Sequence, residues 1–326
     1  MSSHEDIQLV HELGQFREKF ISEIGKVIIG QQNIIDHFLI SLICKGHTLL
    51  VGVPGLAKTL LIKSMSELLD LKFSRIQFTP DLMPSDITGT EVIEEEPGSG
   101  KRTFRFFKGP VFGNIILADE INRTPPKTQS ALLQAMQEHT VTTSGKTYVL
   151  DEPFFVLATQ NPIEQEGTYP LPEAQLDRFM FNINIKYPSR EDEVSIVQST
   201  TSGNALKLNP IISQSKLLEF QELVMRVPVA ENVVKYAVDL VANTRANSIG
   251  APPFINEWVD WGAGPRASQY LILGAKGKAI LDGRPSPDIS DVKALALPVL
   301  RHRIITNFNA EAEGIKVDNI ILKLIG

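Results

Sequence analysis

The stretch HTLLVGVPGLAKT, residues 47–59, decides the fold of this chain. Its first five residues form a short apolar run typical of a buried strand, and apolar positions recur at helical spacing from Lys58 to Leu69. Between them, the loop from Gly52 to Thr59 stands where backbone amides and a helix N-terminus can surround phosphate groups. Lys58 supplies a positive charge for the outer phosphates, and Thr59 supplies a hydroxyl for magnesium. The stretch therefore predicts a nucleotide-binding loop.

One position departs from the strict spacing of this loop. The residue before the lysine is Ala57, where the pattern has glycine. Because the methyl group of alanine is small, we expect the loop to bind phosphate with it in place. The alternative is a tight strand-to-helix turn that binds nothing.

Apolar runs alternate with helical segments on both sides of the loop. Residues 7–24 and 31–44 predict two helices before it, and Lys127 to Glu138 predict one after it. We expect strands over the ranges 47–51, 73–78, 114–118, 154–159 and 179–185. Since these strands are mostly apolar, we predict an α/β domain over residues 1–187, with a parallel sheet flanked by helices on both faces.

Two segments interrupt this alternation. The first is an insertion over residues 79–109, which has no clear helix. Within it, two extended runs predict a surface hairpin around the turn Pro97 to Gly100. The second segment, residues 141–150, predicts another hairpin around Ser144 and Gly145.

The pattern changes after residue 187. Ser189 to Asp192 resembles a capping box, and apolar residues then recur at helical spacing. Val233 to Val241 forms one apolar stripe, and Arg266 to Leu281 and Ile289 to Leu300 predict further helices. We therefore predict a smaller all-α domain over residues 188–326.

Two carboxylates and an amide follow predicted strands. The apolar run that starts at Ile115 ends in Asp119 and Glu120, and Asn161 follows the next strand. Carboxyl ends of parallel strands share one edge of a sheet, so these side chains are expected near the phosphate loop. There Asp119 can hold magnesium, Glu120 can activate water and Asn161 can position that water. Taken alone, the acids also fit a solvated turn, and the pair Asn-Pro fits a turn as well.

Composition narrows the possible partners and location. The 326 residues are 43% hydrophobic and 21% charged, as in folded globular proteins, and the net charge of −6 does not favour nucleic acid as a partner. Residues 1–6 lack the features of a secretory signal, and no apolar run approaches the roughly 20 residues of a membrane span. We therefore expect a cytoplasmic protein without a transmembrane segment. The one cysteine, Cys44, is expected to be buried, and the histidines lack paired metal-ligand spacing.

Together and in this order, the motifs resemble those of the AAA+ ATPase superfamily. Their amino-acid sequences are similar to those of its MoxR family, in the helix-2-insert branch. The resemblance covers almost the whole chain. The matching segments are Gly52–Thr59 as Walker A, Ile115–Glu120 as Walker B, Ile121–Arg123 directly after it, Asn161 as sensor 1, Leu176–Phe179, Gly264–Arg266, the insertion at 79–109 and the hairpin at 141–150.

The resemblance implies roles for individual residues. Arg178 is similar to the arginine finger, which reaches the nucleotide of a neighbouring subunit, although by itself it also fits a local ion pair. Arg266 is similar to sensor 2, which contacts phosphate from the helical lid, residues 188–326. The role of Arg123 stays open. The residues implied in catalysis are Glu120, Asn161, Arg178 and Arg266. Those implied in binding ATP are Ile28, Ile29, Gly30, Gly52, Val53, Pro54, Gly55, Leu56, Ala57, Lys58, Thr59, Leu60 and Asp119, of which Thr59 and Asp119 hold Mg²⁺.

The resemblance also implies a function. It describes an ATP-hydrolysing, chaperone-like protein that forms a homo-oligomeric ring, typically a hexamer, and remodels partner proteins, often ones with a von Willebrand factor A domain. Two alternatives stay open. One is a nucleotide-gated scaffold with little turnover, which Ala57 suggests. The other is a DNA-handling or chelatase-type AAA+ motor, of which the DNA-handling form is disfavoured by the acidic charge. For the segment Ile28 to Gly30, a role in the apolar core is the alternative to adenine binding.

Overall fold

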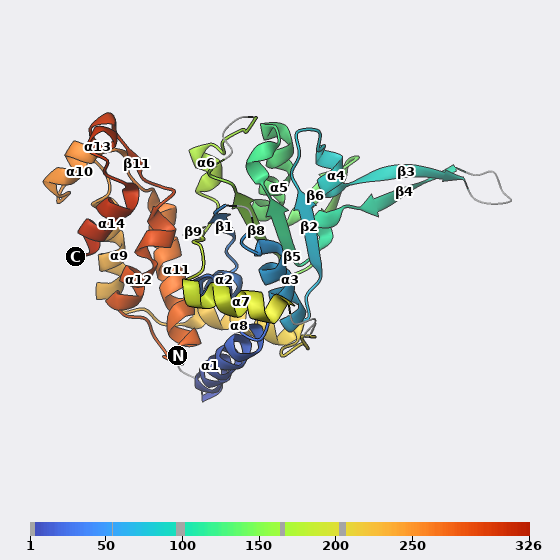
Figure 1. Ribbon diagram of the computed structural model, residues 1–326, viewed down its shortest axis with the longest axis horizontal. Coiled ribbons are helices and arrows are strands. Elements are labelled where there is room, and N and C mark those ends of the chain that lie inside the picture. Colours follow the sequence, from blue (N-terminus) through green and yellow to red (C-terminus); the bar gives the residue numbers. More distant parts are fainter. Residues whose placement is uncertain (1–3, 54, 96–101, 164–166, 202–206) are drawn as a thin grey trace.

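A five-stranded sheet forms the centre of the computed structural model, which describes residues 4–53, 55–95, 102–163, 167–201 and 207–326 (Figure 1). The strands lie in the order β2-β5-β8-β1-β9, and every neighbouring pair is parallel. Their bounds are β1 Thr48–Val51, β2 Phe73–Gln77, β5 Ile115–Asp119, β8 Phe155–Gln160 and β9 Phe181–Asn184. The predicted parallel sheet is confirmed.

The side chains of β1 show how the sheet is buried on both faces. Leu49 packs into the hydrophobic cluster that includes α5, whereas Leu50 packs into the cluster that includes α3, because successive strand residues point to opposite faces. The helices over the two faces are α1 His4–Ile24, α2 Gln32–Ile43, α3 Lys58–Leu68 and α8 Gln214–Arg226 on one, and α4 Pro84–Thr88 and α5 Pro126–Glu138 on the other.

The register of the sheet brings several strand ends to one edge. Val51 pairs with Gln160 on one side and with Asn184 on the other, and Gln77 pairs with Asp119. The loop after β1, the acids at the end of β5 and the polar residues at the end of β8 therefore meet at the carboxyl edge, where open α/β sheets bind ligands.

Two antiparallel hairpins are attached to this core. Their strands are β3 Gly89–Glu95 with β4 Arg102–Lys108, and β6 Thr140–Thr143 with β7 Lys146–Val149. The first hairpin extends away from the body of the molecule (Figure 1). The ring of Phe106 stacks on that of Tyr148 with centroids 4.4 Å apart, so the two hairpins touch. Both predicted hairpins are confirmed, and the turn predicted at Pro97 to Gly100 lies outside the described residues.

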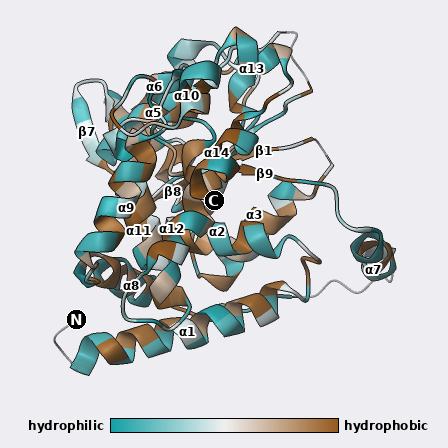
Figure 2. Ribbon diagram, turned by 90° about the vertical axis from the view of Figure 1, so that its left-hand side faces the viewer, coloured by the Kyte–Doolittle hydropathy of each residue, from teal (hydrophilic) through white to brown (hydrophobic). Residues whose placement is uncertain are grey.

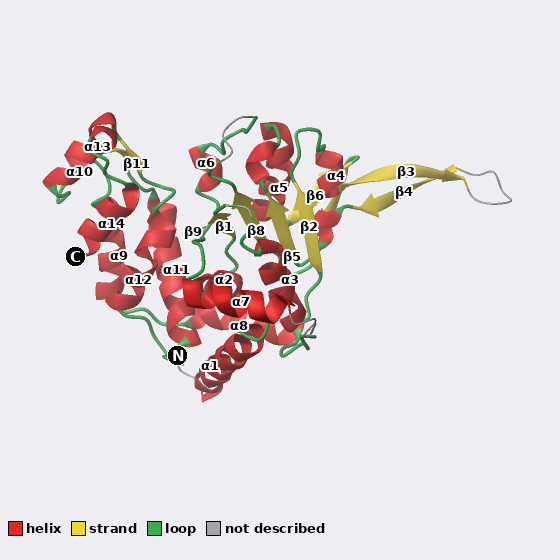
Figure 3. Cartoon of the chain, in the orientation of Figure 1, coloured by secondary structure: helices red, strands yellow, loops and turns green. Residues whose placement is uncertain are grey.

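The chain after residue 187 is mainly helical (Figure 3). α11 packs against α9 and α12 and also against α1 and α2, so one hydrophobic cluster runs from the N-terminal helices into this region. The domain boundary at residue 187 therefore stays a prediction. Besides α8, the helices of the described part of this region are α7 Arg190–Thr201, α9 Glu231–Ala242, α10 Pro253–Trp258, α11 Pro265–Leu281, α12 Ile289–Leu300, α13 Phe308–Ala312 and α14 Val317–Ile325.

Some short elements escape the sequence analysis. β10 (Val259–Trp261) pairs with β11 (Ile305–Thr306) within the mainly helical region, and the short helix α4 lies in the insertion. Segments of two to five residues are too short to display a hydrophobic period, so contacts with distant parts of the chain decide their conformation.

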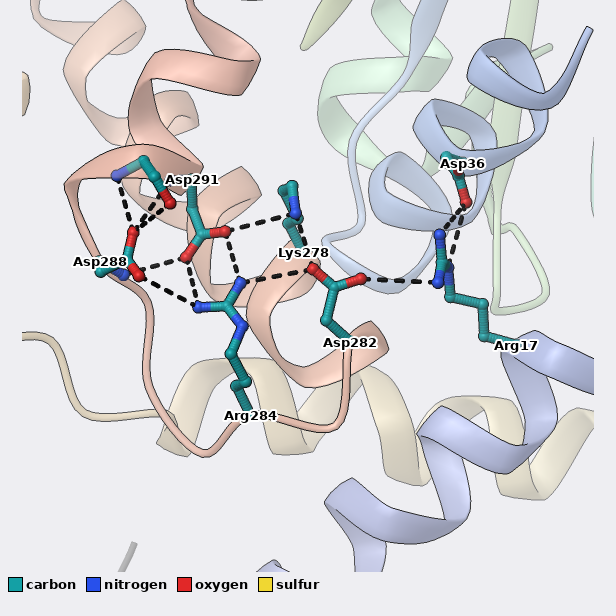
Figure 4. A network of polar contacts seen from close by, with 8 residues as sticks. Arg17, Asp36, Lys278, Asp282, Arg284, Asp288 and Asp291 are labelled. Carbon is teal, nitrogen blue, oxygen red and sulfur yellow. Dashed lines mark hydrogen bonds and ion pairs between the residues drawn. The ribbon is translucent and has the colours of Figure 1, made fainter.

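A polar network ties the N-terminal helices to the connection between α11 and α12 (Figure 4). Arg17 of α1 lies 2.8 Å from Asp36 of α2 and 3.5 Å from Asp282 after α11. Asp291, in the first turn of α12, is almost fully buried and pairs with Arg284 at 2.5 Å. These contacts hold α11 and α12 against α1 and α2.

Two further features follow from burial. Cys44 is buried as expected, and burial raises the pKa of its thiol to about 12, so it is a poor nucleophile.

α7 stands apart from the rest of the molecule in Figure 2, and no residue of it is buried. In the described part of the chain, no helix has both the length and the apolar character that crossing a membrane requires.

Candidate functional site

Two glycines shape the loop after β1. A Cβ atom on Gly52 would lie 1.8 Å from Cγ2 of Ile185, so a larger residue does not fit there. Gly55 has a φ of +88°, and no atom lies within 4 Å of the place its Cβ would take, so the backbone faces open space. An open turn at the start of a helix can bind an anion through its amides. Pro54, also expected in this site, lies outside the described residues.

Lys58 lies between this loop and the acids of β5. Its Nζ donates a hydrogen bond to the carbonyl oxygen of Gly52 at 2.7 Å. Burial lowers the pKa of Lys58, while the negative charges of Asp119 and Glu120 oppose that shift. The amine is therefore within electrostatic range of both carboxylates. Thr59 follows it in the first turn of α3.

Ala57 has a backbone conformation that favours glycine. Its φ of 52° and ψ of 27° lie in the left-handed region, immediately before α3. In this region the Cβ of an L-residue crowds the following carbonyl oxygen, at a cost of about 1–2 kcal/mol. The structure thus gives the physical reason why glycine is usual before the lysine.

Replacing Ala57 with glycine is expected to raise the free energy of unfolding by about 0.5–1 kcal/mol, because relief of the left-handed strain outweighs the extra entropy of glycine in the unfolded chain. Urea unfolding followed by circular dichroism measures the change. The matched control is Ala294→Gly, at an exposed position inside α12, where a loss of about 1 kcal/mol is expected. Equal losses in the two variants would contradict the strain at Ala57.

Both carboxylate oxygens of Asp119 have partners from neighbouring strands. Oδ1 accepts a hydrogen bond from the hydroxyl of Thr159 at 2.7 Å, and Oδ2 accepts one from the guanidinium of Arg75 at 2.6 Å. The same hydroxyl of Thr159 accepts a hydrogen bond from the backbone amide of Glu120 at 2.9 Å. Thr159 on β8 therefore holds the carboxylate of Asp119 and the backbone of Glu120.

Glu120 follows β5 with a φ of 58°, again in the left-handed region. Non-glycine residues in this region are uncommon, and strained backbone is concentrated at functional sites. Its Oε2 accepts a hydrogen bond from Nε2 of Gln77 at 3.1 Å and pairs with NH1 of Arg123 at 3.0 Å. The carboxylate is thus held at the carboxyl edge from two sides.

Arg75, Gln77 and Thr159 are residues of this site that the sequence analysis does not single out. Arg75 and Gln77 are two positions apart on β2, so they lie on the same side of the sheet. The sequence does contain a signal for Arg75 and Gln77. They are polar residues at alternate positions of a strand that ends at the ligand-binding edge. Arg123, whose role the resemblance leaves open, is a partner of Glu120.

Asn161 lies at the same edge and is buried. With Val51 and Gln160 it lines a cavity of about 250 Å³. Its Oδ1 accepts a hydrogen bond from the amide of Ile163 at 3.1 Å. The turn expected from the pair Asn-Pro is therefore present, and it holds Asn161 beside the end of β1.

The segment Ile28 to Gly30 also lies toward the carboxyl edge, because the α2 helix that follows it ends just before β1 begins. Ile28 is buried in the hydrophobic core, as the alternative interpretation expects. A Cβ on Gly30 would lie 3.0 Å from Oδ2 of Asp192 in the first turn of α7. The segment therefore contacts the core through Ile28 and α7 through Gly30.

Arg178 and Arg266 lie together at the opposite edge of the sheet. The amide of Met180 donates a hydrogen bond to the carbonyl oxygen of His47, which precedes β1, so the residues before β9 lie at the amino-terminal edge. There NH1 of Arg266 pairs with Oδ2 of Asp177 at 3.0 Å, next to Arg178. The structure thus brings Arg266 close to Arg178, toward the edge of the sheet opposite to the one with the phosphate loop.

A buried arginine, Arg303, organises this second cluster. Its Nε donates to Oδ1 of Asp177 at 2.7 Å, and its NH2 donates to the carbonyl oxygens of Asp177 and Phe179 at 2.9 and 2.8 Å. NH1 of Arg178 donates to the carbonyl oxygen of Leu133 in α5 at 2.8 Å. Arg303 could not be found from the sequence, because its partner Asp177 is distant in the chain and no local pattern connects the two residues.

Known proteins match the chain over most of its length. Residues 47–181 match the ATPase family associated with various cellular activities (AAA), and residues 255–324 match the AAA lid domain. The chain is 43% identical to Chaperone MoxR1 of Mycobacterium tuberculosis, over 94% of the chain and 80% of that protein. It is 40% identical to the uncharacterized protein YeaC of Bacillus subtilis, over 94% of the chain and 92% of that protein. A crystal structure of a candidate ATPase from Cytophaga hutchinsonii shares 43% identity and a TM-score of 0.90, covering 98% of this chain and 96% of that one.

Proposed function

This chain belongs to the MoxR family of AAA+ ATPases, and we propose that it hydrolyses ATP at the carboxyl edge of its sheet. One observation carries the proposal: the register of the parallel sheet brings the loop after β1, which ends in Lys58 and Thr59, to the same edge as the acids at the end of β5. A cation for the phosphates, an acid for the metal and an acid for the attacking water are the groups that phosphoryl transfer requires.

The residues at this edge fit ATP with Mg²⁺. Thr59 and Asp119 offer the hard oxygen ligands that Mg²⁺ prefers, and this ion usually takes only one or two protein ligands beside phosphate and water. When bound, the ion neutralises charge on the phosphates. The open turn at Gly55 and the amine of Lys58 bind the phosphates. Glu120 orients the attacking water and accepts its proton, and Asn161 helps to position that water.

Arg178 and Arg266 belong, in this proposal, to the site of the neighbouring subunit. In their own chain they lie toward the amino-terminal edge of the sheet, opposite to the edge with the phosphate loop. In a homo-oligomeric ring, which we propose to be a hexamer, the amino-terminal edge of one subunit faces the loop of the next. The two guanidinium groups then stabilise charge on the phosphate oxygens, and hydrolysis depends on assembly.

We propose that the chain uses ATP hydrolysis to remodel partner proteins. The chaperone name of the Mycobacterium tuberculosis relative supports this role, and proteins with a von Willebrand factor A domain are the partners we propose. A scaffold with little turnover is disfavoured because Glu120 is present at the carboxyl edge. The net charge of −6 disfavours a DNA-handling motor.

Isothermal titration calorimetry with Mg²⁺ and a non-cleavable ATP analogue tests the proposal. We expect the wild-type chain to bind the analogue and Lys58→Ala to weaken binding by about tenfold to a hundredfold, the range for losing hydrogen bonds between charged groups. Lys63→Ala is the matched control, because Lys63 is an exposed residue of the same helix. If the wild type binds no analogue, the proposed function is wrong.

A further inference from the structure

Arg75 links the two acids of the proposed ATP site. Its NH2 group donates to Oδ2 of Asp119 at 2.6 Å and to Oε1 of Gln77 at 2.5 Å. Because the oxygen of the Gln77 amide accepts this bond, its nitrogen is turned toward Glu120, to which it donates at 3.1 Å. A single guanidinium therefore contacts the carboxylate of Asp119 directly and that of Glu120 through Gln77.

Each carboxylate oxygen of Asp119 already has one partner. Thr159 donates to Oδ1, and Arg75 pairs with Oδ2. A metal ion that approaches this carboxylate meets a positive charge already in contact with it, and the two charges repel each other. The guanidinium and a metal ion therefore disfavour each other at this carboxylate, although each oxygen keeps a second lone pair.

We propose that Arg75 competes with Mg²⁺ for Asp119, and that exchange of the guanidinium for the metal also loosens Gln77 from Glu120. The inference rests on the proposed function and adds a coupling to it. Displacement of the guanidinium from Asp119 would then loosen one of the two partners of Glu120, while the ion pair with Arg123 stays in place. In this role Arg75 is a positioning residue.

The exposure of the arginine side chain distinguishes the Arg75–Asp119 ion pair from a purely structural ion pair. The side chain of Arg75 is 45% exposed, so it can swing into solvent and be hydrated there. The side chain of Arg303, which pairs with Asp177 at the opposite edge, is only 2% exposed and has no such path. The Asp119 side chain is only 15% exposed, but the guanidinium end of the pair is open to solvent, which weakens the pair and lets a divalent ion compete with Arg75.

Binding of fluorescently labelled ADP at increasing concentrations of Mg²⁺ tests the competition. We expect Arg75→Ala to lower the Mg²⁺ concentration at half-maximal effect by about threefold to fivefold, the range that corresponds to losing one exposed ion pair. Arg75→Lys keeps the charge but lacks the planar fork, so its midpoint is expected between those of Arg75→Ala and the wild type.

Arg105→Ala is the matched control, because it removes an exposed strand arginine from an ion pair on the β3–β4 hairpin. We expect it to leave the Mg²⁺ midpoint unchanged. A structural role for Arg75 would weaken ADP binding at every Mg²⁺ concentration without lowering the midpoint, and that result in both Arg75 variants overturns the inference while leaving the proposed function intact. Absence of ADP binding by the wild type would instead overturn the proposed function.

Discussion

Replacing Arg178 with alanine is expected to lower ATP turnover by about three orders of magnitude, the smaller end of the range for an arginine finger. Binding of a non-cleavable ATP analogue is expected to stay close to that of the wild type, because Arg178 lies across the sheet from the loop of its own chain. Release of phosphate measures turnover, and calorimetry measures binding. The substitution also removes the hydrogen bond to Leu133, so circular dichroism must first show that the variant is folded.

A mixing experiment tests directly whether two subunits share the site. Arg178→Ala subunits keep an intact phosphate loop, and Lys58→Ala subunits keep an intact arginine. If the site is shared, a mixture of the two variants forms some complete sites and regains turnover that neither variant has alone. A mixture as inactive as its components would rule out the proposed role of Arg178 in the neighbouring site.

Replacing Glu120 with glutamine is expected to lower turnover by about a hundredfold to ten-thousandfold, the range for loss of a general base. The amide has the shape of the carboxylate and keeps an oxygen that can accept the hydrogen bond from Gln77, but it cannot take a proton from water. Nucleotide binding is expected to persist. Phosphate release under saturating ATP is the measurement.

Glu138→Gln, at an exposed position near the end of α5, is the control for this variant. It removes the same charge from a helix surface and is expected to leave turnover unchanged. If Glu120→Gln hydrolyses ATP at the rate of the wild type, the nucleotide-gated scaffold becomes the better account of the protein.

The parts of the fold that local sequence predicts are those with a complete local pattern. The strands of the central sheet are mostly apolar runs bounded by turns, and helices such as α11 repeat apolar residues over several turns. β10 and β11 have three and two residues, so they carry no such pattern. They exist because the packing of the mainly helical region brings Val259 next to Thr306.

Some residues around the two acids can be predicted from local sequence, and others cannot. Lys58, Asp119 and Glu120 belong to short motifs that follow strands, and parallel strands bring those motifs to one edge. Arg75 and Thr159 join them through contacts between strands that are distant in the sequence. Such contacts depend on strand order and register, which no local window of sequence contains.

The sequence by itself predicted Lys58, Asp119 and Glu120 at the carboxyl edge of the sheet, because each belongs to a contiguous motif that directly follows a strand. Only the tertiary structure decided on which side of the sheet Arg266 lies. α12 packs against β9, and the buried Arg303 binds Asp177, so the start of α11 is held beside Arg178 at the amino-terminal edge. The physical reason is that the position of a helical region depends on which faces it buries, and that choice is made by side chains far apart in the chain.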